Sequence, residues 1–165
     1  MIKKHYYSWQ DIEAMCTNIV KKMYKDNFTP DYILGITRGG NIPATIISNM
    51  LDIPCEAMKI SFRNDDKQED HWLSKLVSTP APTGMEKKIL IVDDINDTGR
   101  TFKYIWNDWG LSQKNHKVKF ATLTDNLGSK FEEVRYSVHE VNKTEEDVWL
   151  VYPWENVGEY NEIRN

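Results

Sequence analysis

The chain has 165 residues, of which 40% are hydrophobic and 28% charged, and this size and composition suit one folded domain. Its 21 Lys and Arg residues against 25 Asp and Glu residues leave a formal net charge of -4, which argues against a nucleic-acid-binding protein, because such proteins usually carry a basic excess. The longest unbroken apolar run, residues 148–152, is far too short to cross a membrane, and Cys16 and Cys55 show neither metal-ligand spacing nor a disulfide pattern, so we expect a cytoplasmic protein that contacts no membrane.

The first sixty residues predict an alternation of helix and strand. Ser8 is a candidate N-cap with an acidic residue three positions later, and apolar residues then recur at helical spacing, which predicts a helix over residues 9–25. The apolar run 32–37 predicts a buried strand, and Pro43 lies where the first turn of a second helix tolerates proline. Residues 56–62 alternate like a further strand.

A long loop of about residues 61–87 interrupts this alternation. It is rich in acidic residues and proline, and a loop of this length inside a compact domain is usually functional or disordered. After it, the sequence predicts strands at 89–92, 118–124, 137–141 and 148–152 and a helix at 101–109. The alternation predicts a single α/β domain over 1–165, with a parallel sheet flanked by helices on both faces and a core over about 8–124.

The most informative motif is the run Asp-Asp-Ile-Asn-Asp-Thr-Gly-Arg-Thr at residues 93–101, directly after a predicted strand. In an open α/β sheet, ligands bind at the carboxyl ends of the strands. There the N–H groups of a helix N-terminus and the hydroxyls of Thr98 and Thr101 would donate hydrogen bonds to a phosphate. Asp93 and Asp94 repel a phosphate and suit ribose hydroxyls or a hydrated Mg²⁺. The alternative is a solvated turn whose acids only cap the next helix.

A second candidate anion site follows the predicted strand at 32–37. Gly39 and Gly40 would let backbone N–H groups approach a ligand closely, and Arg38 offers a forked donor for phosphate oxygens. By itself this segment would more often be an ordinary turn. Together with the acidic run it indicates a site for a phosphorylated sugar.

These two motifs resemble those of the type I phosphoribosyltransferase family, and the 6-oxopurine enzymes for xanthine, guanine and hypoxanthine are the most similar form. The resemblance covers about residues 8–157 and includes the segments 147–149 and 153–155. One departure is Asn96, where the family usually has an apolar residue. The resemblance implies the family's fold, with a flexible loop and a base-binding hood at about 125–160, and a requirement for Mg²⁺.

The resemblance also implies a role for each residue of the two motifs. Asp93 and Asp94 would hold the ribose hydroxyls of 5-phosphoribosyl 1-pyrophosphate (PRPP) and orient the metal. Arg38 would stabilise the leaving pyrophosphate, and Asp97 would exchange a proton with the purine as general acid/base, unless it only caps the following helix. The implied pyrophosphate loop is Thr37, Arg38, Gly39 and Gly40, and the implied 5′-phosphate loop is Thr98, Gly99, Arg100 and Thr101.

Three further residues are implied to bind the base. Trp149 would stack on the purine, with backbone carbonyls near Leu150 at the ring edge, although core packing is the commonest fate of a Trp in an apolar run. Asn126 stands where 6-oxopurine enzymes have a lysine that donates to the 6-oxygen. A neutral amide accepts as well as donates, so this departure leaves the choice of base open.

The function implied is transfer of the 5-phosphoribosyl group from PRPP to hypoxanthine, guanine or xanthine, which releases pyrophosphate and forms a nucleoside 5′-monophosphate for purine salvage. The resemblance also implies a homo-oligomer. Two alternatives stay open: a PRPP-binding regulatory protein of the same fold, and a phosphoribosyltransferase for a pyrimidine or another acceptor.

Overall fold

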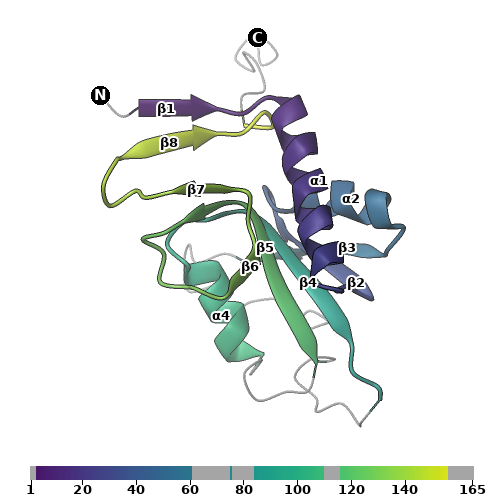
Figure 1. The fold of residues 1–165 in the computed structure, drawn as a ribbon. Coiled ribbons are helices and arrows are strands. Elements are labelled where there is room, and N and C mark those ends of the chain that lie inside the picture. Colours follow the sequence, from purple (N-terminus) through teal and green to yellow (C-terminus); the bar gives the residue numbers. More distant parts are fainter. Residues whose placement is uncertain (1–2, 61–74, 76–83, 110–115, 156–165) are drawn as a thin grey trace, which may run out of the picture.

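The computed structural model describes residues 3–60, 75, 84–109 and 116–155 (Figure 1). Its main feature is a six-stranded sheet in which every strand pairing is parallel. The strands are β2 (Tyr32–Thr37), β3 (Cys55–Lys59), β4 (Lys88–Asn96), β5 (Lys117–Asn126), β6 (Val134–Tyr136) and β7 (His139–Val141). They lie in the order β3-β2-β4-β5-β6, and β7 pairs with the end of β5.

Among the described residues, three helices cover the two faces of this sheet: α1 (Trp9–Lys25), α2 (Asn41–Leu51) and α4 (Arg100–Asp108). Helices on both faces are what the sequence predicts. Helices α1 and α2 pack on the face that carries Ile33 and Leu90, and α4 packs on the face that carries Leu34 and Ile89. Neighbouring strand residues point to opposite faces, so the two buried clusters lie on either side of the sheet. Figure 1 shows α1 and α2 on one side of the sheet and α4 on the other. In the part of the chain that the structure describes, no helix is long and apolar enough to cross a membrane.

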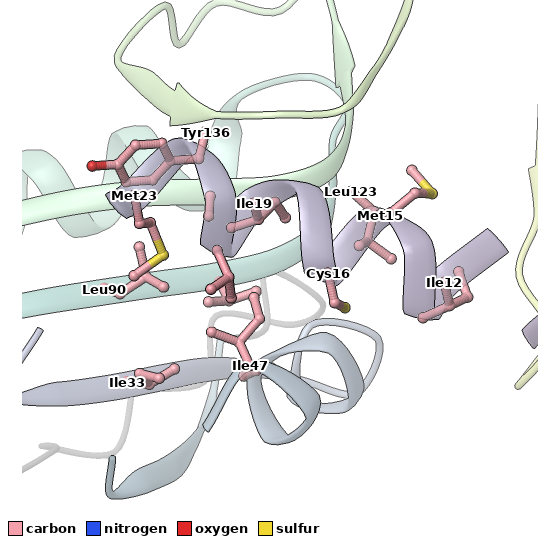
Figure 2. Close-up of a cluster of buried hydrophobic side chains, with 14 of the residues drawn as sticks. Ile12, Met15, Cys16, Ile19, Met23, Ile33, Ile47, Leu90, Leu123 and Tyr136 are labelled. Carbon is pink, nitrogen blue, oxygen red and sulfur yellow. The ribbon is translucent and has the colours of Figure 1, made fainter. Parts of the chain in front are cut away.

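Helix α1 has the N-cap and the buried apolar stripe that its sequence predicts. The Ser8 side chain accepts a hydrogen bond from the amide of Asp11, and the Asp11 carboxylate accepts one from the amide of Ser8, so a capping box begins the helix. Its apolar stripe then points toward the strands and α2 (Figure 2). Cys16 lies fully buried in this stripe, and burial raises the pKa of its thiol to about 12, as suits a packing residue.

Strand β4 is longer than predicted and contains the acid pair. Residues 93–96 continue the parallel ladder, in which Asp93 pairs with Thr122 and Ile95 with Thr124 of β5. The strand predicted at 89–92 therefore continues through both acids as far as Asn96. A strand that ends at 92 would leave these backbone groups without the partners that β5 supplies.

A second, two-stranded sheet lies beyond β7, and one of its strands is not predicted from the sequence. Strand β1 (Lys3–Tyr6) pairs in parallel with β8 (Val148–Val151) (Figure 1). An ion pair of 2.8 Å between Lys3 and Glu146 holds this pairing, and so does a 2.9 Å hydrogen bond from the amide of Tyr7 to the carbonyl of Val151. The N-terminus thus belongs to the same layer as the expected hood.

The long loop lies mostly outside the described residues, because 61–74 and 76–83 are not described. The strand predicted at 56–62 is β3, which ends at Lys59. The strand predicted at 137–141 is β7, which begins at His139. Strand β6, at 134–136, is not predicted from the sequence, and the register of its pairing with β5 shifts between Phe120 and Ala121.

Candidate functional site

The acid pair, Asp93 and Asp94, lies at the carboxyl end of β4. Nearby groups do not fully compensate the negative charge of the two carboxylates. The amide of Asp94 donates to Asp93 Oδ1 at 2.9 Å, and the amide of Ile95 donates to Asp94 Oδ1 at 2.8 Å. Burial raises the pKa of Asp93 well above its ordinary value, and the charge of Asp94 adds to this effect. Burial also raises the pKa of Asp94. A bound cation or a set of hydroxyl donors would relieve this cost.

The glycine loop after β2 packs directly against the acid pair. A Cβ atom on Gly39 would lie 1.8 Å from Asp94 Oδ2, and one on Gly40 would lie 2.5 Å from the carbonyl oxygen of Val92. Only a residue without a side chain allows this approach. The two motifs, which are more than fifty positions apart, are therefore in contact, because β2 and β4 are neighbouring strands.

The segment from Asp97 to Gly99 joins β4 to α4. Gly99 has a φ of 78°, in the left-handed region that favours glycine, and a Cβ there would lie 2.5 Å from the amide nitrogen of Phe131. Gly99 has no side chain to cap α4, and the amide of Arg100 makes a long hydrogen bond of 3.4 Å to Thr98 Oγ1, so the N-terminus of the helix is placed to meet an anion. Thr98 and Arg100 lie exposed beside them, and Thr101 is half-buried.

A cleft of about 810 Å³ lies between the main sheet and the hood, and this volume suits a small-molecule ligand. Trp149 is 58% exposed, between the buried side chains of Val148 and Leu150, so its ring belongs to the cleft and not to the core. One wall comes from the core of the domain: Arg38, Gly39, Ile42 and Asp94. The other comes from the hood: Lys4, Tyr6, Trp149, Val151, Trp154 and Glu155.

The candidate residues therefore divide into two groups. Arg38, Gly39, Asp94 and Trp149 meet around one cleft. Asp97 and the segment 98–101 lie further along the same sheet edge and are not among the described residues that line it.

Asn126 does not face the cleft as a base ligand would. It is 7% exposed, and its Nδ2 donates to the carbonyl oxygen of Asp97 at 2.9 Å. Its Oδ1 accepts from the amides of Gly128 at 3.2 Å and Lys143 at 3.1 Å. The side chain thus ties the loop after β4 to the hood.

Lys143 is a functional candidate that the sequence reasoning missed. Its Nζ lies 3.0 Å from Asp97 Oδ1, and its side chain is 22% exposed. The lysine comes from a loop after β7, seventeen positions beyond Asn126, and no local pattern marks it. Only the pairing of β7 with the end of β5 brings it to Asp97.

Asn96, the departure from the family pattern, has a similar structural reason. It is 3% exposed, and its Nδ2 donates to Asp125 Oδ1 at 2.8 Å and to the carbonyl of Phe131 at 3.0 Å. Ser129 Oγ donates to its Oδ1 at 3.0 Å. An apolar residue would leave these buried groups without partners.

Replacing Asn126 with Ala is expected to lower the free energy of unfolding by about 1–3 kcal/mol, because buried backbone groups lose their partners. Urea denaturation of both proteins measures this loss. Asn126→Asp is the matched variant, since it keeps the acceptor and loses the donor to Asp97. A stability equal to the parent in both variants would contradict the tying role.

Residues 3–154 match the family described as phosphoribosyl transferase domain, so the chain belongs to the phosphoribosyltransferase family. The parallel α/β fold with helices on both faces agrees with the fold that the sequence of this chain predicts.

Two curated relatives and one solved structure extend this comparison. The chain is 31% identical to a xanthine-guanine phosphoribosyltransferase of Cereibacter sphaeroides, over 97% of this chain and 92% of the relative. It is 28% identical to a hypoxanthine-guanine phosphoribosyltransferase of Schizosaccharomyces pombe, over 91% of this chain and 88% of the relative. The purine phosphoribosyltransferase structure from Pyrococcus horikoshii is 25% identical with a TM-score of 0.70 and covers 96% of this chain and 97% of its own.

Proposed function

We propose that this protein transfers the 5-phosphoribosyl group from PRPP to hypoxanthine, guanine or xanthine. The observation that carries the proposal is the cleft in which Arg38 and Asp94 face an exposed Trp149. One wall has the charges that a sugar pyrophosphate needs, and the other has the aromatic ring that a planar base needs. The names of the curated relatives support a 6-oxopurine as acceptor.

The sugar substrate would bind along the carboxyl edge of the sheet. The Arg38 guanidinium and the loop of Thr37, Gly39 and Gly40 would take the pyrophosphate, and the N-terminus of α4 with residues 98–101 would take the 5′-phosphate. Asp93 and Asp94 lie between these two anion sites in the chain and would accept hydrogen bonds from the ribose hydroxyls.

The acid pair also fits Mg²⁺, because its donors are carboxylate oxygens whose mutual repulsion is uncompensated in the protein alone. Among the described residues no group of three or more His, Cys, Asp and Glu side chains could hold a metal, so substrate and water oxygens would complete the coordination. When bound, the ion would supply positive charge for the pyrophosphate that leaves.

In the reaction, the bond from ribose C1 to the pyrophosphate oxygen breaks and a bond from C1 to a purine ring nitrogen forms. Arg38 would stabilise the charge that grows on the leaving group. Asp97 would take the proton that the purine loses at N7, and its contact with Lys143 would hold the carboxylate in place. Trp149 would stack on the ring, with the carbonyl of Leu150 at its edge.

For Asn126 we propose a positioning role in place of base contact, because its polar atoms already bind Asp97, Gly128 and Lys143. We also propose that the chain acts in the cytoplasm as a homo-oligomer, which analytical ultracentrifugation tests.

The proposed function is tested with a panel of bases, PRPP and Mg²⁺, with pyrophosphate release as the signal. We expect release with at least one 6-oxopurine, and loss of release when EDTA removes the metal. PRPP binding without release on any acceptor would favour the regulatory protein. Release with a pyrimidine alone would favour the other enzyme. Activity that EDTA leaves unchanged would contradict the metal.

A further inference from the structure

The N-terminal strand β1 contributes two side chains to the cleft. Lys4 pairs in register with Trp149, and Tyr6 pairs with Val151. Residues in register on neighbouring strands point to the same face, and all four line the cleft. Tyr6 is 57% exposed there, beside the exposed ring of Trp149.

The other face of β1 holds the strand in place. Lys3 forms its ion pair with Glu146, and the His5 ring packs edge-on against Tyr7 with ring centroids 4.7 Å apart. Tyr7, directly after the strand, is 8% exposed and stacks on Tyr152 with centroids 5.0 Å apart. The position of Lys4 above the cleft is therefore set by contacts on the far side of the strand.

The Tyr7 hydroxyl connects β1 to the catalytic edge of the main sheet. It hydrogen-bonds to His139 Nδ1 and, at 2.9 Å, to Thr124 Oγ1. The Tyr152 hydroxyl donates to the backbone oxygen of Asp94 at 3.1 Å and lies within hydrogen-bond distance, 3.1 Å, of the same Thr124 Oγ1. This chain of contacts places the hood wall relative to the acid pair.

The side chain of Lys4 has no hydrogen bond or ion pair with any other residue that the structure describes, although it lies in a cleft that contains Asp94 and Glu155. An ammonium group has three donors and no acceptor. Beside an aromatic ring, such a group suits a planar base with an exocyclic oxygen at its edge and disfavours one with an amino group there.

We propose that β1 forms one wall of the base pocket and that Lys4 is a specificity-determining residue, whose ammonium donates to an exocyclic oxygen of the base stacked on Trp149. This inference rests on the proposed function. In this arrangement the N-terminal strand recognises the oxo group of the base. Lys4 supplies the positive charge that the neutral side chain of Asn126 lacks.

The test compares Lys4→Gln with Lys21→Gln, which removes the same charge at an exposed position of α1 that does not line the cleft. We expect Lys4→Gln to raise KM for the oxopurine about tenfold or more, because the base loses a hydrogen bond from a charged donor. KM for PRPP should stay unchanged. Lys21→Gln should keep both values near those of the parent. Lys4→Gln should also discriminate less strongly against adenine than the parent does.

An equal effect of both variants, or a rise of KM for PRPP alone, would overturn the assignment, as would an unchanged KM for the base. If the parent protein turns over no base, the proposed function fails. A titration with GMP, followed by tryptophan fluorescence, then measures the effect of Lys4 on ligand binding without turnover. Trp149→Phe identifies the part of the fluorescence signal that comes from Trp149. Weaker GMP binding in Lys4→Gln alone supports the inference, and equal binding in both variants overturns it. Circular dichroism checks that each variant is folded.

Discussion

Replacing Asp94 with Asn is expected to lower turnover by about 100-fold or more and to raise the thermal stability of the protein. The carboxylate lies in the cleft, where we propose that it holds ribose and metal, so loss of its charge removes electrostatic stabilisation of the reaction. The same charge destabilises the fold, because burial raises the pKa of Asp94 and the charge of Asp94 in turn raises the pKa of Asp93. A neutral amide of the same shape removes this repulsion.

The sign of the pH dependence follows from these raised pKa values. The folded state binds protons at the acid pair more readily than the unfolded state, so the free energy of unfolding falls as pH rises from about 4 through the raised pKa values. Asp94→Asn should therefore gain most at neutral pH, where both carboxyl groups of the parent must lose their protons. Thermal unfolding of both proteins at several pH values measures the difference.

Asp52→Asn is the matched control for this experiment. Asp52 is an exposed residue that ends α2 with a φ of 53°, a conformation that Asn accepts readily. It should change neither turnover nor the pH dependence of stability. An Asp94→Asn variant that is less stable than the parent at neutral pH would contradict the uncompensated charge, and one with normal turnover would contradict the site.

Replacing Asp97 with Asn is expected to lower kcat by about 10²- to 10⁴-fold, the usual contribution of a general acid/base. The amide keeps the shape and takes no proton from the purine. Lys143→Gln should cause a smaller fall, because this lysine acts through its 3.0 Å contact with the carboxylate. Steady-state kinetics with hypoxanthine and guanine measures both.

Asp108→Asn, at the exposed last position of α4, is the control for the loss of charge and should keep the kcat of the parent. Near-normal turnover of Asp97→Asn with every accepted base would contradict the catalytic role of Asp97 and leave it only the structural role of an ion-pair partner of Lys143. A larger loss in Lys143→Gln than in Asp97→Asn would reverse the proposed order of roles.

Most of the fold could be predicted from local patterns. The capping box at Ser8 and the apolar stripe behind it define α1, and the buried runs of β2 and β4 have the continuous apolar character of a parallel sheet covered on both faces. The end of β4 could not be predicted in this way. Acidic residues disfavour strands by propensity, and pairing with β5 overrides that preference.

Strand β1 is the clearest element that the pattern misses. Lys3–Tyr6 is exposed along its whole length and has no apolar alternation. It is a strand because β8 supplies its hydrogen-bond partners from almost 150 positions away. The candidate base pocket depends on this pairing, since Lys4 and Tyr6 lie in one of its walls.

The amino-acid sequence by itself determined the α/β class and the two motifs, the glycine loop at Gly39 and the acidic run that begins at Asp93, because both depend on residues close together in the chain. The tertiary structure decided how these pieces meet: Gly39 against Asp94, Lys143 against Asp97, and β1 beside Trp149. It also decided that the buried amide of Asn126 hydrogen-bonds to the neighbouring backbone. Such contacts form between segments that only strand order and register bring together, and a local spacing pattern carries no information about either.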